Sequence, residues 1–383
     1  MIIGESELKK AGIITHYNVH NHGAHLQLFA LIQELKKLGY TAQALQFQKN
    51  YDFMGGAAAG KKYNISLRSI PTYLKYTVQN GVDRTAYNVK KREILSDFRK
   101  KHDVVGAYYS EATNINLVVI GSDEIFSIEA GPNPWYYGIG VPCKNQVSYA
   151  ASFGPTTLEM IDEHNMAAMV AAGISNIKAI TVRDKNSADI VKHYSGHDVP
   201  IVCDPVLLHD FSKLFSKERV ERFKQAHPEK YCIVYSYDYN MNDDTTVNSI
   251  KIYAEKRGLK VYSLGYFHKW CDENPNVSPL ELFVWFKCAD MVFTDTFHGS
   301  VISLTTQSQF ISLIRNNQNK LAFLLQQYGV DNRVTSDFTD IEGIVDMPID
   351  YNVVGKTILR IREKSKEALI EAIKKCGAND ERK

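Results

Sequence analysis

The chain alternates short runs of β-branched and aromatic residues with amphipathic segments of helical period, and residues 291–304, MVFTDTFHGSVISL, show this most sharply. Met291–Thr294 is predicted to be a buried strand that ends in a polar turn, and Gly299 then leads into an apolar helix. A strand that passes directly into a helix is typical of a parallel sheet, because parallel neighbours need a long crossover connection. The turn is therefore expected at the carboxyl edge of a sheet, where α/β proteins bind anions beside helix N-termini.

The same order of elements recurs along the chain in two sets. The first set has predicted strands at residues 12–15, 41–48, 116–120, 146–150, 179–182 and 200–203, and predicted helices at 24–38, 66–102 and 158–172. A polar, charged stretch from residue 212 to 230 interrupts it. The second set has predicted strands at 231–235, 260–264, 291–294 and 310–314, and predicted helices at 243–257, 279–287, from 299, and at 320–328.

This rhythm predicts an α/β protein made of two Rossmann-like domains with a cleft between them. The expected boundaries are residues 1–212 and 213–350, with a C-terminal helix in 351–383 that packs back on the N-terminal domain.

Composition and charge exclude several classes. A net charge of +2 offers no dedicated nucleic-acid surface. Six scattered cysteines without a CxxC pair predict neither a disulfide framework nor a zinc site. We find no signal-peptide layout and no apolar run near 18 residues, and therefore expect a soluble, cytoplasmic protein.

Two basic stretches leave two interpretations open. Residues 84–101 carry seven Lys or Arg against two acids, and residues 355–383 carry nine against five. Such stretches are usually solvated helix faces, but they can also attract an anionic membrane or a lipid-linked substrate at its inner face.

The loops after the predicted strands carry the candidate chemistry. His298 could exchange protons near neutral pH, and the alternative is a capped turn with a satisfied histidine. Arg183 ends a predicted buried strand, where it would bind an anion or pair with an internal acid such as Asp184. The loop at residues 16–25 holds four histidines, but their spacing fits no zinc pattern. Its Gly23 instead suits close approach of a ligand.

Residues 55–62, GGAAAGKK, resemble the phosphate-binding loop motif but do not match it fully. Lys62 stands where Ser or Thr should hold magnesium, and no buried strand precedes the segment. We therefore interpret it as a surface loop.

Six segments, in order, resemble motifs of the polysaccharide pyruvyl transferase family. They are NHGAHLQ at 21–27, GSDEIF at 121–126, SYAASFG at 148–154, VRDK at 182–185, VCDP at 202–205 and TDTFHGS at 294–300. The family's forms are NYGAxLQ, GSDQVW, SYAASFG, VREK, VxDP and TDSFHGT. The sequence departs from them at His22, Glu124 and Phe126; His25 stands where an apolar residue is commoner, and Lys320 where many members carry Arg.

The resemblance implies a fold similar to GT-B glycosyltransferases, with phosphoenolpyruvate as donor and co-substrate and a glycan or lipid-linked saccharide as acceptor. It implies His298 as the proton-transfer residue, with Asp295 orienting it or capping the turn and Asp123 as a second candidate base. Neither a metal nor a further cofactor is required. The remaining site residues would hold the donor (Arg183, Lys320, Gly299 and Ser300) or line the acceptor side of the cleft (Asn21, His22, Gly23, Ser122 and Ser152).

Two alternatives remain open at this point. A GT-B glycosyltransferase would place the diphosphate of a nucleotide sugar against Arg183 and Lys320. A non-catalytic glycan-binding relative is the third possibility. The sequence does not indicate the acceptor sugar or the oligomeric state.

Overall fold

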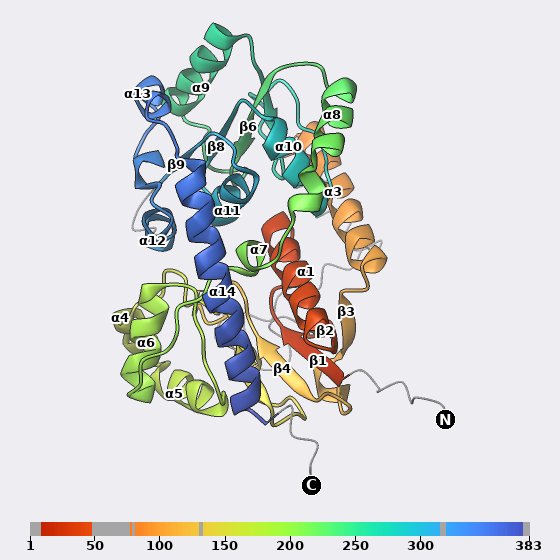
Figure 1. The fold of residues 1–383 in the computed structure, drawn as a ribbon, viewed down its shortest axis with the longest axis vertical. Helices are drawn as coiled ribbons and strands as arrows, with labels where there is room; N and C mark the ends of the chain where they lie inside the picture. Colours follow the sequence, from red (N-terminus) through yellow and green to blue (C-terminus); the bar gives the residue numbers. More distant parts are fainter. Residues whose placement is uncertain (1–8, 48–76, 79–80, 130–132, 315–318, 378–383) are drawn as a thin grey trace.

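The two sets of elements form two lobes, each built on a parallel sheet (Figure 1). The computed structural model describes residues 9–47, 77–78, 81–129, 133–314 and 319–377. The loop at 55–62 and the first part of the predicted helix at 66–102 lie outside these ranges.

The first lobe contains five strands in the order β3-β2-β1-β4-β5. Their bounds are β1 Lys9–Ile14, β2 Tyr40–Gln46, β3 Val105–Tyr108, β4 Leu117–Ile120 and β5 Gln146–Ser148. The interior strand β4 is buried along its whole length, as expected for a parallel strand covered on both faces. The short edge strand β3 was not predicted.

Two predicted strands of this lobe are wrong. Residues 179–182 and 200–203 form isolated bridges, Val147–Ala179, Ala151–Val182 and Val182–Ile201, in place of regular strands. They continue the sheet beyond β5 in the parallel sense, so their backbone still delivers side chains to the same edge.

The helices of the first lobe are α1 His22–Lys37, α3 Val82–Lys101, α4 Leu158–Glu163, α5 Ala167–Asn176, α6 Lys185–Ser195 and α7 Pro205–Leu208. The predicted helix at 158–172 is broken into α4 and α5. Asn165 between them has a φ of 56°, a left-handed conformation that ends a helix.

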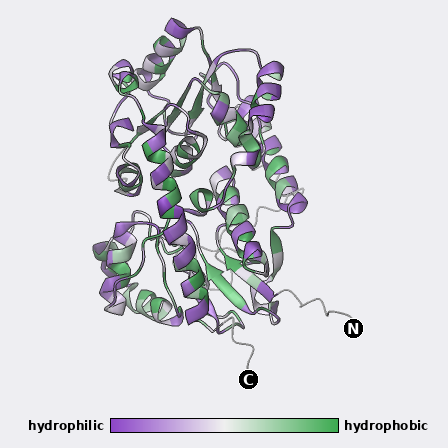
Figure 2. Ribbon diagram, viewed as in Figure 1, coloured by the Kyte–Doolittle hydropathy of each residue, from purple (hydrophilic) through white to green (hydrophobic). Residues whose placement is uncertain are grey.

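The second lobe contains five strands in the order β10-β9-β8-β6-β7. The strands are β6 Tyr231–Tyr235, β7 Lys260–Ser263, β8 Met291–Thr294, β9 Phe310–Leu313 and β10 Val334–Thr335. The helices are α8 Lys217–Ala226, α9 Asp244–Arg257, α10 Leu282–Cys288, α11 Phe297–Thr306, α12 Asn319–Gln327 and α13 Ile341–Asp346. The two-residue β10 and the short α13 carry too little periodicity to be predicted. Apolar residues concentrate on the strands, and polar residues on outward helices (Figure 2).

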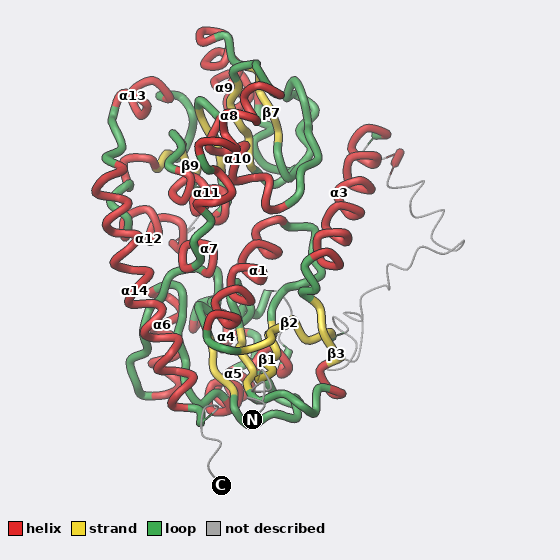
Figure 3. Tube along the Cα trace, turned by 45° about the vertical axis from the view of Figure 1, so that its right-hand side comes forward, coloured by secondary structure: helices red, strands yellow, loops and turns green. Residues whose placement is uncertain are grey.

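The last helix, α14 Tyr351–Lys375, runs along both lobes (Figures 1 and 3). The hydroxyl of Tyr351 donates to the carbonyl of Ser308 in the second lobe. Two hydrogen bonds join α14 to the first lobe. Arg362 Nε on the helix donates to the carbonyl of Leu207 at 2.7 Å, and the amide of Cys203 donates to Ser365 Oγ on the helix at 2.9 Å. The helix thus contacts both lobes, while the domain boundaries themselves stay a prediction. None of the helices in the described ranges is both long and apolar enough to cross a bilayer.

We expect Leu369→Ala to lower the free energy of unfolding by about 2–5 kcal/mol, because Leu369 is 2% exposed where α14 meets the core. The matched control is Leu359→Ala on the same helix, where the leucine is 56% exposed. Urea unfolding of both variants measures the difference. Equal losses would mean that α14 does not depend on this buried face.

Candidate active site

The centre of the site is the buried side chain of Arg183, at the carboxyl edge of the first sheet. Its Nη1 lies 2.9 Å from Asp204 Oδ2 and its Nη2 lies 3.4 Å from Asp123 Oδ1. The guanidinium carbon sits 4.2 Å from the ring centre of Phe297, which belongs to the second lobe. Burial alone would lower the pKa of Arg183, but the carboxylates of Asp123, Asp204 and Asp184 raise it. Arg183 is therefore a permanent cation.

Asp204 was not predicted as a site residue, yet its carboxylate lies between Arg183 and His298. Its Oδ2 accepts from Arg183, lies 3.4 Å from the Ser122 hydroxyl and lies 3.7 Å from His298 Nε2. Its Oδ1 caps α7 by accepting from the Val206 amide at 2.9 Å. The available sequence signal was its place in the VCDP segment, where Asp before Pro favours a helix start.

His298 lies in the first turn of α11, 7% exposed, with Thr296 as the helix cap. Gly23, at the start of α1 in the first lobe, packs on its ring so closely that a Cβ built on Gly23 would lie 2.3 Å from Cγ of the imidazole. Only glycine allows this approach of the two helix starts. The imidazole is thus held between the lobes.

Asp295 does not cap the helix, which was one of the two roles suggested for it. Thr296, not Asp295, caps α11, and Asp204 supplies the carboxylate 3.7 Å from the imidazole. The Asp295 Oδ2 accepts from Asn240 Nδ2 at 2.6 Å.

Asp123 follows β4 with a φ of 79° and points its carboxylate at Arg183. Burial alone would raise its pKa, but the positive charges of Arg183, His298, His16 and Lys320 outweigh burial and lower it. Because a base of low pKa accepts protons poorly near pH 7, Asp123 is a weak candidate base.

Lys320 lies in the first turn of α12, in the second lobe. Its ammonium forms an ion pair with the Glu124 carboxylate, so α12 and the loop after β4 are joined across the site. Burial lowers the pKa of Lys320, and the nearby Asp123 opposes this.

Several other predicted site residues serve the local structure. Ser300 Oγ lies 2.7 Å from Ser312 Oγ, Gly299 donates its amide to the Thr296 cap, and Ser152 Oγ donates to Asp184 at 2.7 Å. Asn21 caps α1 through the Gly23 amide at 2.8 Å. His22 Nε2 lies 2.9 Å from the carbonyl of Val277 and so ties α1 to the second lobe.

Two histidines of the loop at residues 16–25 have lowered pKa values. Burial lowers the pKa of His22 to about 3, with the charge of Lys91 adding to it. Burial also lowers the pKa of His25 to about 4; Asn21 opposes this, and Arg99 adds to it. In the described ranges, no three His, Cys, Asp or Glu side chains converge as a metal site would require.

The fold places the protein in a known class. The structure of Staphylococcus aureus MnaA with UDP superposes with a TM-score of 0.51 at 8% identity, covering 94% of this chain and 91% of that one. A UDP-GlcNAc 2-epimerase from Neisseria meningitidis gives 0.46 at 13% (95% and 100% covered), and the glycosyltransferase SnogD from Streptomyces nogalater gives 0.43 at 12% (96% and 98%). The predicted GT-B-like fold of two Rossmann-like lobes is confirmed.

The sequence itself identifies the family. The family model for polysaccharide pyruvyl transferase matches residues 21–317, so the chain belongs to the polysaccharide pyruvyl transferase family. A comparison with curated proteins returns no match.

The buried histidines predict acid sensitivity. Between pH 6.5 and about 4 the unfolded chain binds protons at His22 and His25 that the folded protein does not, so stability falls as the pH falls. We expect His22 to account for roughly 2–3 kcal/mol of this loss by pH 4. Urea unfolding across this range should give a flatter profile for His22→Gln, whereas His197→Gln, at an exposed position, should retain the wild-type slope. Superimposable profiles for the three proteins would contradict this assignment.

Proposed function

We propose that the protein transfers a pyruvyl group from phosphoenolpyruvate to hydroxyls of a sugar residue, forming a pyruvate ketal on a bacterial surface polysaccharide or its lipid-linked precursor. The observation that carries this proposal is the meeting of His298 with the Arg183–Asp204 pair between the two lobes. Membership of the polysaccharide pyruvyl transferase family supports transfer to a glycan.

The charges of the donor match cations supplied by both lobes. Phosphoenolpyruvate bears a carboxylate and a phosphate, and Arg183 and Lys320 approach the same region from opposite sides. The Arg183 Nε makes no hydrogen bond to a described residue, which leaves a guanidinium donor for a ligand. In this proposal the two cations also stabilise the phosphate as it leaves.

Ketal formation needs proton transfers that a histidine can perform. The methylene carbon gains a proton, a sugar hydroxyl attacks the central carbon, phosphate departs, and a second hydroxyl closes the ring. We assign the proton transfers to His298, a role that typically contributes ~10²–10⁴-fold in rate. Asp204, 3.7 Å from Nε2, is placed to orient the imidazole.

The proposed setting follows from the substrates. We propose phosphoenolpyruvate as co-substrate without a further cofactor, and action in the cytoplasm, at the inner face of the membrane where the acceptor is lipid-linked. The alternative is a glycosyltransferase that binds a nucleotide sugar, which the UDP and UDP-GlcNAc complexes of proteins with related folds keep open.

Thermal stabilisation by ligands separates the two functions. We expect phosphoenolpyruvate at 100 times its Kd to add ~2.7 kcal/mol of stability, whereas UDP, GDP and CMP sugars add none. Arg183→Lys should weaken the effect because a single ammonium replaces the planar guanidinium. Arg222→Ala, whose arginine is 70% exposed, is the control. Stabilisation by a nucleotide sugar alone would instead establish the glycosyltransferase.

The contact between Gly23 and His298 gives a test of catalysis. In Gly23→Ala the new Cβ must push the imidazole aside, and we expect a loss of about 10²-fold in kcat, typical for a misplacement of about 1 Å. Gly355→Ala on α14, where a Cβ would meet nothing within 4 Å, should keep the wild-type rate. Phosphate release from phosphoenolpyruvate in the presence of an accepted sugar measures both. A fully active Gly23→Ala enzyme would remove His298 from the mechanism.

A further inference from the structure

Four of the basic residues of α3 contact the rest of the protein, namely Arg84, Lys91, Arg92 and Arg99. Arg84 Nε lies 3.5 Å from Asp238 Oδ2, Arg92 Nε donates to His20 Nε2 at 3.2 Å, and Arg99 Nη1 lies 2.9 Å from His25 Nε2. Lys91 Nζ lies 4.1 Å from the ring centre of Tyr266. This part of the basic stretch is therefore not a solvated helix face, contrary to one interpretation of the sequence.

Lys91 differs from these arginines because it is almost completely buried and no counter-charge from the described part of the chain contacts it. It is 2% exposed, and within the described ranges it forms no ion pair or hydrogen bond. Burial lowers its pKa to about 8, and Asp238 opposes this, so the ammonium is largely retained at neutral pH. Its contact with the Tyr266 ring satisfies this buried charge only in part, because no oxygen acceptor among the described residues receives its N–H donors.

A row of tyrosines connects Lys91 with the candidate active site. The Tyr266 ring, beneath Lys91, lies 5.1 Å from the ring of Tyr237, which stacks on Tyr239 at 5.7 Å and 8°. Burial raises the pKa of Tyr237; the charge of Asp123 adds to this and that of Arg183 opposes it, so its hydroxyl lies within the field of the site. Tyr239 is 74% exposed, which opens the row to solvent.

A second connection runs through α1. The charge of Lys91 acts on His22, and the next residue, Gly23, packs on His298. Lys91 thus acts on the residue next to the glycine that packs on the proposed catalytic histidine. The proposed function assigns Arg183 and Lys320, but not Lys91, to the donor.

We propose that Lys91 and the row Tyr237, Tyr239 and Tyr266 form the acceptor subsite, and that the acceptor sugar carries an oxyanion that pairs with Lys91. This inference rests on the proposed function. Tyrosine faces offer rigid apolar surfaces for a sugar ring, and an oxyanion would supply the missing counter-charge. The oxyanion is either a phosphate on the sugar or the carboxylate of a uronic acid.

The test compares charged and neutral sugars in the presence of saturating phosphoenolpyruvate. Titration calorimetry would measure the binding of hexose 1-phosphates, of hexuronates and of the parent hexoses. We expect the wild type to prefer one charged class by tenfold or more, and the class that it prefers identifies the source of the oxyanion. Lys91→Met should abolish this preference and Lys91→Arg should keep part of it.

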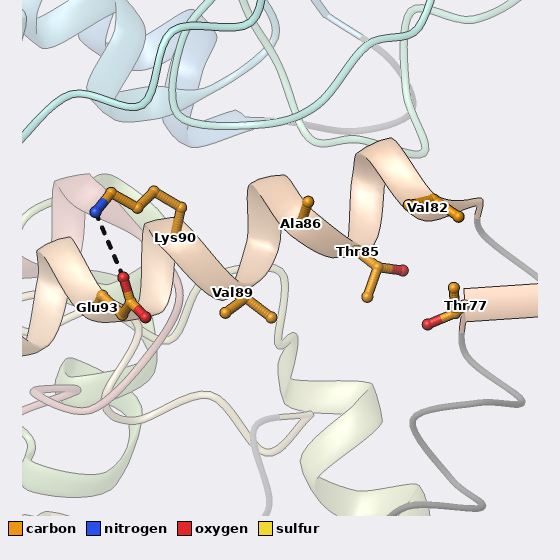
Figure 4. Close-up of a pocket in the computed structure, with 7 residues that line it drawn as sticks. All are labelled: Thr77, Val82, Thr85, Ala86, Val89, Lys90 and Glu93. Atoms are coloured by element: carbon orange, nitrogen blue, oxygen red, sulfur yellow. Dashed lines mark hydrogen bonds and ion pairs between the residues drawn. The ribbon is translucent and has the colours of Figure 1, made fainter.

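The control is the neighbouring lysine on the outward face of α3. Figure 4 shows that face, a shallow pocket in which Lys90 pairs with Glu93; Lys90 is 63% exposed. Lys90→Met should retain the full preference for the charged sugar. Lys91→Met should also have a higher Tm than the wild type without ligands, because an unpaired buried charge is removed; this shows that the variant folds.

Two outcomes separate the inference from the proposed function. If phosphoenolpyruvate stabilises both the wild type and Lys91→Met, but neither prefers a charged sugar, the acceptor inference is overturned and the proposed function stands. A preference that survives in Lys91→Met overturns it as well. If phosphoenolpyruvate stabilises neither protein, the proposed function fails first, and the inference fails with it.

Discussion

The buried charge of Arg183 is the constraint on which the rest of the site depends. An ion removed from water costs several kcal/mol unless partners surround it, so a fold that buries this guanidinium must deliver carboxylates to it. Asp123 and Asp204 come from two separate loops of the first lobe, and the ring of Phe297 comes from the second. The contacts that the Arg183 guanidinium needs thereby fix the positions of the loop after β4, the start of α7 and the start of α11. The contact with Phe297 is also one of those that join the two lobes.

The charge balance around Arg183 also limits how a donor can bind. Asp123, Asp204 and Asp184 already act on the guanidinium. A trianionic ligand at Arg183 alone would be repelled by these carboxylates. In the proposed mechanism the second cation is Lys320, from the opposite lobe and paired with Glu124, and a ligand that displaces Glu124 would free it. Donor binding and lobe contact are therefore coupled in the proposed mechanism.

Local features of the site could be read from the sequence, whereas contacts between distant segments could not. The turn after β8 was predicted because strand, polar turn and helix start follow one another within residues 291–304. The sheets were predicted for the same reason, from short apolar runs. The approach of Gly23 to His298 depends on how two lobes meet, which no local pattern contains. Asp204 was missed likewise: its role appears only when Arg183 and His298, 21 residues before it and 94 after it, are brought beside it.

The burial of Lys91 follows the helical period of α3. The buried residues of α3 are Tyr87, Lys91, Leu95 and Phe98, which share one stripe of helical period. Counting charges along the stretch hides this, because Lys91 then resembles its exposed neighbour Lys90. A lysine on the apolar stripe reduces stability relative to an apolar residue of similar length, since its charge must be desolvated. Among the described residues the contact of this charge is the Tyr266 ring, and the proposed acceptor oxyanion would supply the counter-charge.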